Sequence, residues 1–271
     1  MKQKWHLLTT ALALVVAGLW LYPFYLMLVN ALKSRQEIFT NTLGLPHEPQ
    51  WANFVSAYVQ MDFTRSFVNS LGITVVSVLV LVVFASTAAY ALSRNHSKLS
   101  NGTYLLFATA MLIPFQSIMI PLVSLFGRAN MLNHVGLVFM YLGLGSSMAI
   151  FLYFGALRAI PRALDEAATI DGCNPLQVFS YIIFPLLKPT TVTVMVLNGI
   201  WFWNDFLLPS LVIHQPEQFT IPLNMFFFFG QFTRQWDLAL AALIIAIMPV
   251  IGLYMFLQRY IIKGVSDGAV K

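Results

Sequence analysis

The stretch SFVNSLGITVVSVLVLVVFASTAAYALS, residues 66–93, contains no Asp, Glu, Lys or Arg. About 20 consecutive apolar residues are enough for an α-helix to cross a bilayer, so this stretch is long enough to do so. A strand of a membrane β-barrel would alternate apolar and polar residues over about ten positions. The segment ITVVSVLVLVVF, residues 73–84, shows no such alternation. The stretch therefore predicts a transmembrane α-helix.

The composition of the whole chain agrees with this prediction. The 271 residues are 59% hydrophobic and only 9% charged, with a mean hydropathy of +0.77. Soluble domains carry about 25% charged residues, so this chain has too few for a surface that faces water. Similar apolar stretches recur along the chain, and one of them holds a single charge, Asp205. We expect one all-α integral membrane domain, residues 1–271, with six transmembrane helices over residues 5–32, 67–93, 103–126, 135–157, 190–213 and 238–260.

The first apolar stretch lies within MKQKWHLLTTALALVVAGLWLYPF, residues 1–24, where basic residues precede it as in a signal peptide. Its apolar run is longer than the usual 7–15 residues, and no A-x-A-like cleavage site follows it. We therefore expect a retained first helix.

Basic residues predict the orientation, because cytoplasmic loops of membrane proteins are enriched in Lys and Arg. With a cytoplasmic N-terminus, ten of the fifteen basic residues fall inside. These are Lys2, Lys4, Arg94, Lys98, Arg158, Arg162, Lys188, Arg259, Lys263 and Lys271. The outer side then holds Lys33, Arg35, Arg65, Arg128 and Arg234. We expect a multi-pass protein with both termini in the cytoplasm, whose net charge of +5 requires no nucleic-acid partner.

Residues 158–189, RAIPRALDEAATIDGCNPLQVFSYIIFPLLKP, interrupt the apolar chain between the fourth and fifth spans. Pro161 suits the first turn of a helix, and Asp165 and Glu166 follow where the helix dipole favours acidic side chains. Gly172 can take the left-handed conformation that ends a helix. The pattern predicts a short cytoplasmic helix that stops at a glycine corner.

A second helix is expected after this corner, because Asn174 is a good N-cap and Pro175 suits the first helical position. It runs to about Tyr181, and Pro185 then leads into the membrane. Two interpretations remain open. The helix pair is either a solvated amphipathic linker at the lipid headgroups or a rigid docking element for a cytoplasmic partner.

The segment EAATIDG, Glu166–Gly172, followed after nine residues by IIFP, Ile182–Pro185, resembles the EAA loop of ABC-importer permeases, with Phe184 in place of the usual leucine. In that family the loop is a coupling helix that sits in a cleft of the ATP-hydrolysing subunit. The resemblance implies that the residues that couple this chain to such an ATPase are Glu166, Ala167, Ala168, Asp171, Gly172, Pro175, Pro185, Gly268 and Lys271.

Other stretches resemble the sugar-importing, maltose-type branch of that family. They are YPFYLMLVNALKSRQEIF (residues 22–39), LIPFQSIMIPL (112–122), WFWNDFLLPSL (201–211) and GVSDGAVK (264–271). The resemblance implies a permease for a sugar or oligosaccharide in a prokaryotic cytoplasmic membrane. It also implies a second permease, as a heterodimer, with two ATPase subunits that bind ATP and Mg and an external solute-binding protein. The chain itself has no G-x-x-x-x-G-K-[ST] loop, so we expect no enzymatic activity, cofactor or metal in it.

Asp205 is the one acidic residue within an expected span, and charged residues there usually face a bundle interior or a watery cavity. Asn204, Trp201 and Trp203 lie beside it. Carboxylates and amides bind sugar hydroxyls, and flat aromatic rings stack on sugar faces, so these four residues are candidates for the substrate pathway. The alternative is that Asp205 only bonds a neighbouring helix.

The outer loop before the last span holds a run of phenylalanines that includes Phe226 and Phe229, with Trp236 after it. They form either an aromatic anchor at the membrane interface or a contact for the external binding protein. Pro114 and Pro121, in the third expected span, are either hinges of moving helices or static kinks.

Three functions remain in competition. An ATP-driven sugar importer accounts for the EAA-like loop. A secondary transporter coupled to ions or protons would need a coupling site of membrane carboxylates, and only Asp205 is available. Within the importer class, a permease for a non-sugar solute is the alternative to a sugar permease. A membrane scaffold or sensor would have no use for the loop.

Overall fold

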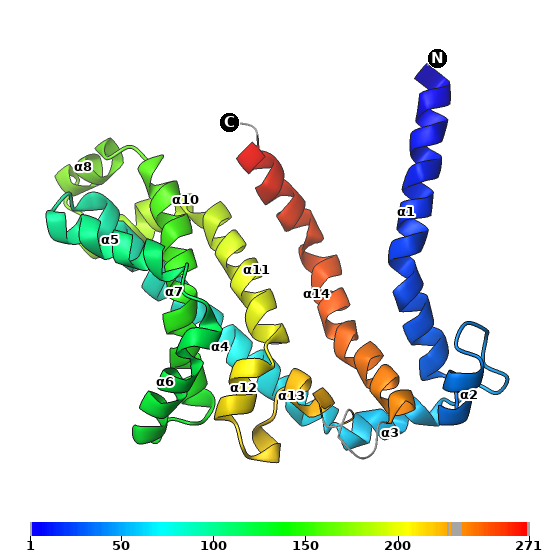
Figure 1. Cartoon of the computed structure of the whole chain (residues 1–271). Helices are drawn as coiled ribbons and strands as arrows, with labels where there is room; N and C mark the ends of the chain where they lie inside the picture. The colour runs from blue at the N-terminus through cyan, green and yellow to red at the C-terminus, as the bar shows by residue number, and fades with distance from the viewer. Residues whose placement is uncertain (1, 227, 229–234, 270–271) are drawn as a thin grey trace. The chain divides into compact units, whose positions relative to one another are not determined.

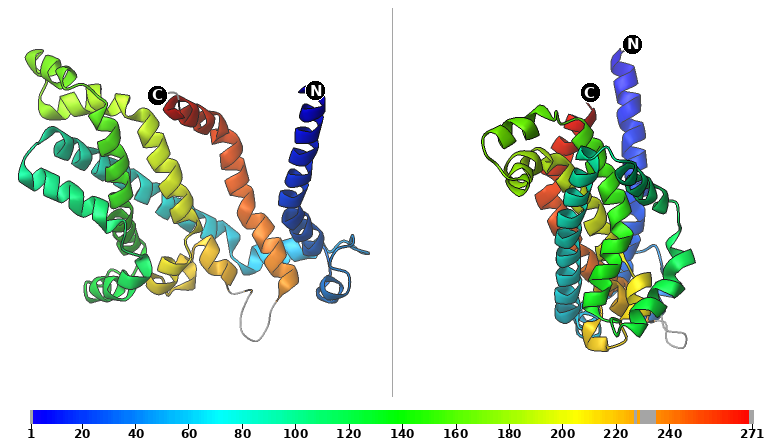
Figure 2. Two further views of the ribbon diagram at one scale, coloured as in Figure 1. Left: turned by 45° about the horizontal axis from the view of Figure 1, so that its top comes forward. Right: turned by 90° about the vertical axis from the view of Figure 1, so that its left-hand side faces the viewer.

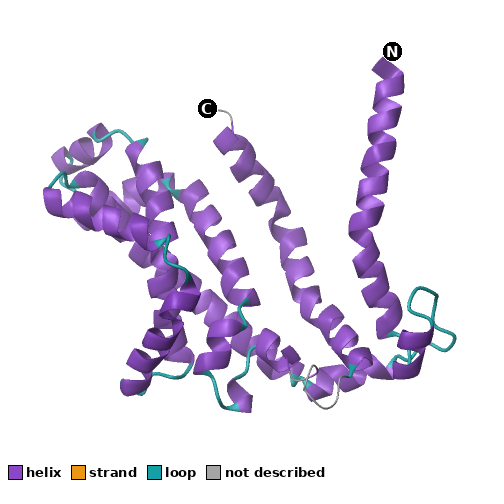
Figure 3. Ribbon diagram, in the orientation of Figure 1, coloured by secondary structure: helices purple, strands orange, loops and turns teal. Residues whose placement is uncertain are grey.

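The computed structural model describes residues 2–226, 228 and 235–269. Within these residues every regular element is helical (Figures 1 and 3), as the long apolar runs predict, since a helix satisfies all its backbone groups within one segment. The expected all-α class is confirmed.

The chain divides into two compact units, residues 1–66 with 221–256, and residues 67–220 with 257–271. Helices α4 and α14 each have residues in both units. The first unit holds α1 (Lys2–Ala31), α2 (Arg35–Thr40), α3 (Ala52–Gln60), α13 (Ile221–Phe226) and most of α14 (Trp236–Ala269). The second holds most of α4 (Phe63–Arg94), then α5 (Lys98–Ala110), α6 (Phe115–Arg128), α7 (His134–Arg158), α8 (Ala163–Ile170), α9 (Pro175–Gln177), a π-helical segment η1 (Val178–Ile183), α10 (Phe184–Leu186), α11 (Lys188–Asn204), α12 (Leu207–Val212) and a 3₁₀ turn η2 (Pro216–Gln218).

Three described helices are long and apolar enough to cross a membrane, over Thr9–Ala31, Phe63–Arg94 and His134–Arg158. The number rises to five if each of two bent helix pairs forms one span. The last expected span, 238–260, corresponds to a shorter apolar stretch of α14, Trp236–Gly252. Membrane-crossing helices are therefore present, whereas a total of six spans stays a prediction.

The third expected span, 103–126, falls on two helices, α5 and α6, which meet at 108°. The break falls at Pro114, which has extended backbone angles (φ −67°, ψ 137°) and precedes the first residue of α6. Proline disfavours helical geometry in the residue before it, so α5 ends ahead of Ile113. Pro114 therefore separates two helices, whereas Pro121 lies inside α6.

Helix α7 is the centre of the second unit, and both α5 and α11 pack against it (Figures 1 and 2). The helices approach closely at Gly145. A Cβ atom there would lie 3.0 Å from a methyl of Leu81, 3.1 Å from Oδ1 of Asn198 and 3.3 Å from the ring of Phe202. Glycine is therefore needed for the crossing of α4, α7 and α11.

A fully buried lysine organises the first unit. Lys33, which sequence reasoning treated only as an outer charge, follows α1, and its exposed fraction is 0%. Its ammonium group donates to Oδ1 of Asn30 at 3.2 Å and to the backbone carbonyls of Asn41 and Thr42. The carbonyl of Lys33 in turn accepts from the side chain of Asn53 at 2.9 Å. These bonds hold the end of α1 to the loop that follows α2.

Candidate functional site

The segment between α7 and α11 has the glycine corner that the sequence predicts. Asp165 and Glu166 lie in the first turn of α8, and Gly172 follows its end with a φ of +88°. The amide of Gly172 donates to the carbonyl of Thr169, and the amide of Cys173 donates to that of Ala168, both at 3.0 Å. This pair of bonds is a Schellman motif, which satisfies the last carbonyls of the helix.

The second helix begins at Asn174 as predicted. The side chains of Asn174 and Gln177 each bond the backbone N–H of the other at 2.9 Å, and Pro175 takes the first helical position. The helix does not remain α-helical up to Tyr181. It becomes the π-helical segment η1, since Pro185 has no N–H to donate to the carbonyl of Tyr181, four residues before it. Residues 175–186 then meet α11 at an angle of 76°.

An ion pair fixes α8 to the end of α4. The Nη2 of Arg94 lies 2.8 Å from Oδ2 of Asp165, and Nε lies 3.2 Å from Oδ1. The hydroxyl of Tyr90 donates to the same Oδ1 at 2.6 Å. Both charged side chains are 17% exposed, so water screens the pair less than it would a surface pair. Sequence reasoning placed Asp165 in the first turn of this helix but missed its partner, because 71 residues separate Asp165 from Arg94.

The same region connects α4 to the end of α7. The guanidinium of Arg94 also donates to the carbonyls of Leu157 and Ile160 at 3.4 Å. Arg162 donates to the carbonyl of Ser93 at 3.0 Å. Side chains as well as the backbone therefore connect α8 to α4 and to the end of α7.

The exposure of the proposed coupling residues separates them into two groups. Ala168 is buried against the chain itself. The following are exposed: Glu166, Ala167, Asp171, Gly172, Pro175 and Pro185. Gly268 lies in α14, and Lys271 lies outside the described residues.

Three large apolar side chains that sequence reasoning did not select lie on the same element: Ile170, Leu176 and Tyr181 are 85%, 70% and 74% exposed. Their positions in the sequence do not indicate that they are exposed, because apolar residues with such spacing are also common in protein cores. Exposed apolar groups on a polar loop mark a surface that is suited to a partner.

Asp205 lies at the junction of α11 and α12, directly after Asn204, the last residue of α11. Its Oδ2 accepts a hydrogen bond from the hydroxyl of buried Tyr141 at 2.9 Å. Its Oδ1 accepts from the amide of Leu207, in the first turn of α12, at 3.1 Å. The carboxylate therefore links α7, α11 and α12.

The residues beside Asp205 point to different neighbours. Trp201 is 40% exposed and meets the Tyr141 ring at 6.2 Å in an edge-on contact. Trp203 packs edge-on against Phe67 at 5.9 Å. Asn204 is exposed, and its amide donates to the backbone of its own helix. Trp201 and Asp205 thus both contact Tyr141, whereas Trp203 contacts Phe67.

The outer aromatic residues are described only in part. Phe226 ends α13 and is 55% exposed, while Phe229 lies outside the described residues. Helix α13 is held by Asn224, whose amide donates to the carbonyl of Met61 at 3.0 Å and to the hydroxyl of Ser66. Phe226 is therefore presented from an anchored helix.

Residues 81–267 match the family described as binding-protein-dependent transport system inner membrane component. The chain is 50% identical over 264 residues to the probable starch degradation products transport system permease protein AmyC of Thermoanaerobacterium thermosulfurigenes, covering 97% of this chain and 96% of that protein. It is 35% identical to the melibiose/raffinose/stachyose import permease protein MelC of Bacillus subtilis, covering 97% and 95%. Its fold is similar to a chain in the crystal structure of a bacterial ABC transporter involved in alginate import, with a TM-score of 0.78, 23% identity and coverage of 95% and 96%.

Proposed function

The chain belongs to the family of binding-protein-dependent transport system inner membrane components, and on that premise we propose that it imports a sugar or oligosaccharide. The permease names of the relatives from Thermoanaerobacterium and Bacillus, which refer to starch products and to raffinose-type sugars, support this substrate class. In the proposal, the chain forms the translocation pathway with a second permease. An external solute-binding protein delivers the sugar to this pair.

Two ATPase subunits supply the energy in this proposal and bind ATP and Mg. The support is the sequence, which contains no phosphate-binding loop of the G-x-x-x-x-G-K-[ST] type. In this proposal the chain itself performs no hydrolysis. It converts the motion of the ATPase subunits into a change in the side of the membrane to which the pathway is open.

The observation that carries the proposal is the α8–Gly172–α9 element, which is exposed on one side and fixed on the other. Its exposed side presents Glu166 with Ile170 and Leu176, a polar and apolar mixture suited to a protein cleft. Its other side is held to α4 through Asp165. When the ATPase pair closes, the element moves with it, and α4, α7 and α11 turn the pathway from inward-facing to outward-facing.

The proposed roles of Asp205 and of the other candidate residues differ from one another. Asp205 holds α11 and α12 to Tyr141, because both of its oxygens accept hydrogen bonds from the chain. Trp201 and Asn204 are exposed and are the better candidates for sugar contact. Phe226 is the described candidate for contact with the solute-binding protein.

We further propose that both termini lie in the cytoplasm of a prokaryotic cell. The excess of ten basic residues over five on the expected cytoplasmic side supports this orientation. Under this orientation the α8–α9 element faces the cytoplasm, where an ATPase is available to it.

Co-purification tests the proposal directly. A tagged chain extracted from its native membrane is expected to bring down an ATPase subunit and a second permease. A chain that is recovered alone under conditions that preserve membrane complexes would contradict the importer assignment.

The substitution Gly172→Val tests the corner within the assembled transporter. Valine at a φ of +88° is strained by about 1–2 kcal/mol or more, so the corner shifts and sugar uptake falls, while membrane insertion survives. Gly155→Val is the control, because Gly155 lies within α7 and a Cβ atom there meets nothing within 4 Å. Normal uptake by Gly172→Val would show that the geometry of the corner is not needed.

A further inference from the structure

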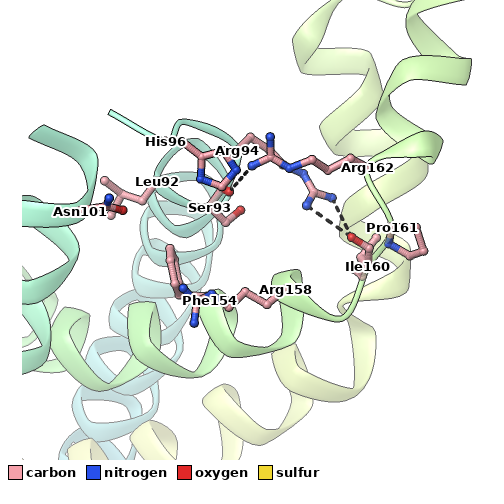
Figure 4. A pocket seen from close by; sticks show the side chains of 10 residues that line it. All are labelled: Leu92, Ser93, Arg94, His96, Asn101, Phe154, Arg158, Ile160, Pro161 and Arg162. Atoms are coloured by element: carbon pink, nitrogen blue, oxygen red, sulfur yellow. Dashed lines mark hydrogen bonds between the residues drawn. The ribbon is translucent and has the colours of Figure 1, made fainter. Parts of the chain in front are cut away.

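A cavity of about 280 Å³ opens between the ends of α4 and α7 and the start of α5. Figure 4 shows the side chains that line it. They are Leu92, Ser93, Arg94, His96, Asn101, Phe154, Arg158, Ile160, Pro161 and Arg162. Its volume is near the lower end of the range for small-molecule sites, about 300–1,000 Å³. The proposed function assigns nothing to it.

The cavity carries more positive charge than the chain neutralises. Of its three arginines, Arg94 is paired with Asp165. Within the described part of the chain, Arg158 and Arg162 form no salt bridge. The guanidinium of Arg158 lies 5.1 Å from the centre of the Phe154 ring, and Arg162 bonds a backbone carbonyl. Two guanidinium groups therefore face the cavity without an anion.

Apolar side chains lie beside these charges, since the guanidinium of Arg158 covers the ring of Phe154. Leu92 and Phe154 lie two and four residues before the ends of α4 and α7, two helices that are long and apolar enough to cross a membrane. Arg94 and Arg158 are the last residues of these helices, so apolar and cationic side chains meet in the cavity where the two helices end. A soluble anion has no use for the apolar side, whereas a phospholipid presents a phosphate next to its glycerol and acyl chains. Basic pockets between membrane helices bind such headgroups.

We propose that this cavity binds the phosphate of an anionic phospholipid, with Arg158 and Arg162 as its principal ligands. Guanidinium groups match phosphate oxygens in paired hydrogen bonds. The contact with the Phe154 ring fixes the position of the Arg158 guanidinium at the wall of the cavity. Ile160 and Pro161 form part of the same wall and lead directly into α8. A lipid bound in the cavity therefore stabilises the position of the α8–α9 element. In this way the bound lipid regulates the transport activity of the chain.

Native mass spectrometry of the full-length chain in a mild detergent tests the proposal. Phosphatidylglycerol and phosphatidylcholine are added at equal concentrations, and retained lipids are counted. We expect wild-type chain to retain phosphatidylglycerol preferentially. Arg158→Gln should weaken this binding about tenfold, the effect of losing one charged hydrogen-bonded contact. Arg128→Gln removes an exposed arginine at the end of α6 and should leave binding unchanged.

Further variants and a competitor separate the alternative sources of the anion. Arg158→Lys, which keeps the charge without the paired geometry, should bind with intermediate affinity and serves if Arg158→Gln fails to fold, as judged by circular dichroism. Excess inorganic phosphate should not displace the lipid. Equal retention of both lipids, or full retention by Arg158→Gln, overturns the proposal. So does binding of inorganic phosphate without the lipid, or loss of a co-purified ATPase from Arg158→Gln while its lipid remains bound.

Discussion

The pair formed by Arg94 and Asp165 gives the sharpest quantitative test of how the coupling element is held. The substitution Asp165→Asn keeps the side-chain volume and removes the charge that accepts bonds from Arg94 and Tyr90. Breaking a fully buried ion pair costs about 3–5 kcal/mol, and a surface pair contributes about 0–1 kcal/mol. With both side chains 17% exposed, we expect the free energy of unfolding to fall by about 2 kcal/mol, between these limits.

A double-mutant cycle isolates the pairwise part of this loss. Arg94→Gln should cost somewhat more than Asp165→Asn, because it also removes the bonds to the carbonyls of Leu157 and Ile160. The loss of unfolding free energy in the double variant should be smaller than the sum of the losses in the two single variants by about 1–2 kcal/mol. The assay is unfolding of the purified chain in mixed micelles with increasing SDS, followed by the fluorescence of its six tryptophans.

The neighbouring acid is the matched control. Glu166 is exposed, so Glu166→Gln should change the free energy of unfolding by less than about 0.5 kcal/mol. If Glu166 contacts the ATPase as proposed, the same substitution should lower uptake without lowering stability. The reasoning about the pair is refuted if Asp165→Asn matches wild type in the unfolding assay, or if the cycle gives no coupling.

Two further predictions concern packing outside this element. Gly145→Ala should lower the free energy of unfolding by about 1–3 kcal/mol, because the new methyl group meets three side-chain atoms at 3.0–3.3 Å, whereas Gly155→Ala on the same helix should be neutral or stabilising. The same SDS titration measures both, and equal effects of the two would contradict the close crossing. Lys33→Met should lower the free energy of unfolding by about 2–4 kcal/mol, and thermal unfolding should show it. The substitution removes the donor to the buried Oδ1 of Asn30 and to the partly buried carbonyls of Asn41 and Thr42. Lys98→Met, at an exposed position, is its control, and a similar effect of both lysine variants would argue against a specific role for Lys33.

Local features of this fold were predictable because each depends on a few adjacent residues. The charge-free runs predicted membrane-crossing helices, since length and hydrophobicity alone decide whether a helix can span a bilayer. Gly172, Asn174 and Pro175 predicted a corner and a restart, because each residue suits one backbone position at a helix end. The structure bears out the corner at Gly172 and the helix start at Asn174 and Pro175.

Other features depend on contacts between distant segments and gave no local signal. Arg94 and Asp165 are separated by 71 residues, and no spacing rule pairs them. Lys33 belongs to a residue type that is rarely buried unless its charge is satisfied, so sequence alone favours exposure. Pro114 was ambiguous because proline within an apolar run is compatible with both a kink and a complete break, and packing decides between them.

The π-helical segment η1 takes up extra chain between the coupling element and α11. Each π-type bond spans one residue more than an α-helical bond, so the segment holds its extra chain within a continuous helix. Removing one residue from η1 would therefore let it return to regular α-helical geometry and leave the elements on either side close to their places. The face of α11 that carries Asn198 and Phe202 toward Gly145 would keep its direction. The side chains of the segment are the stricter constraint, because Val178, Phe179 and Ile183 are buried.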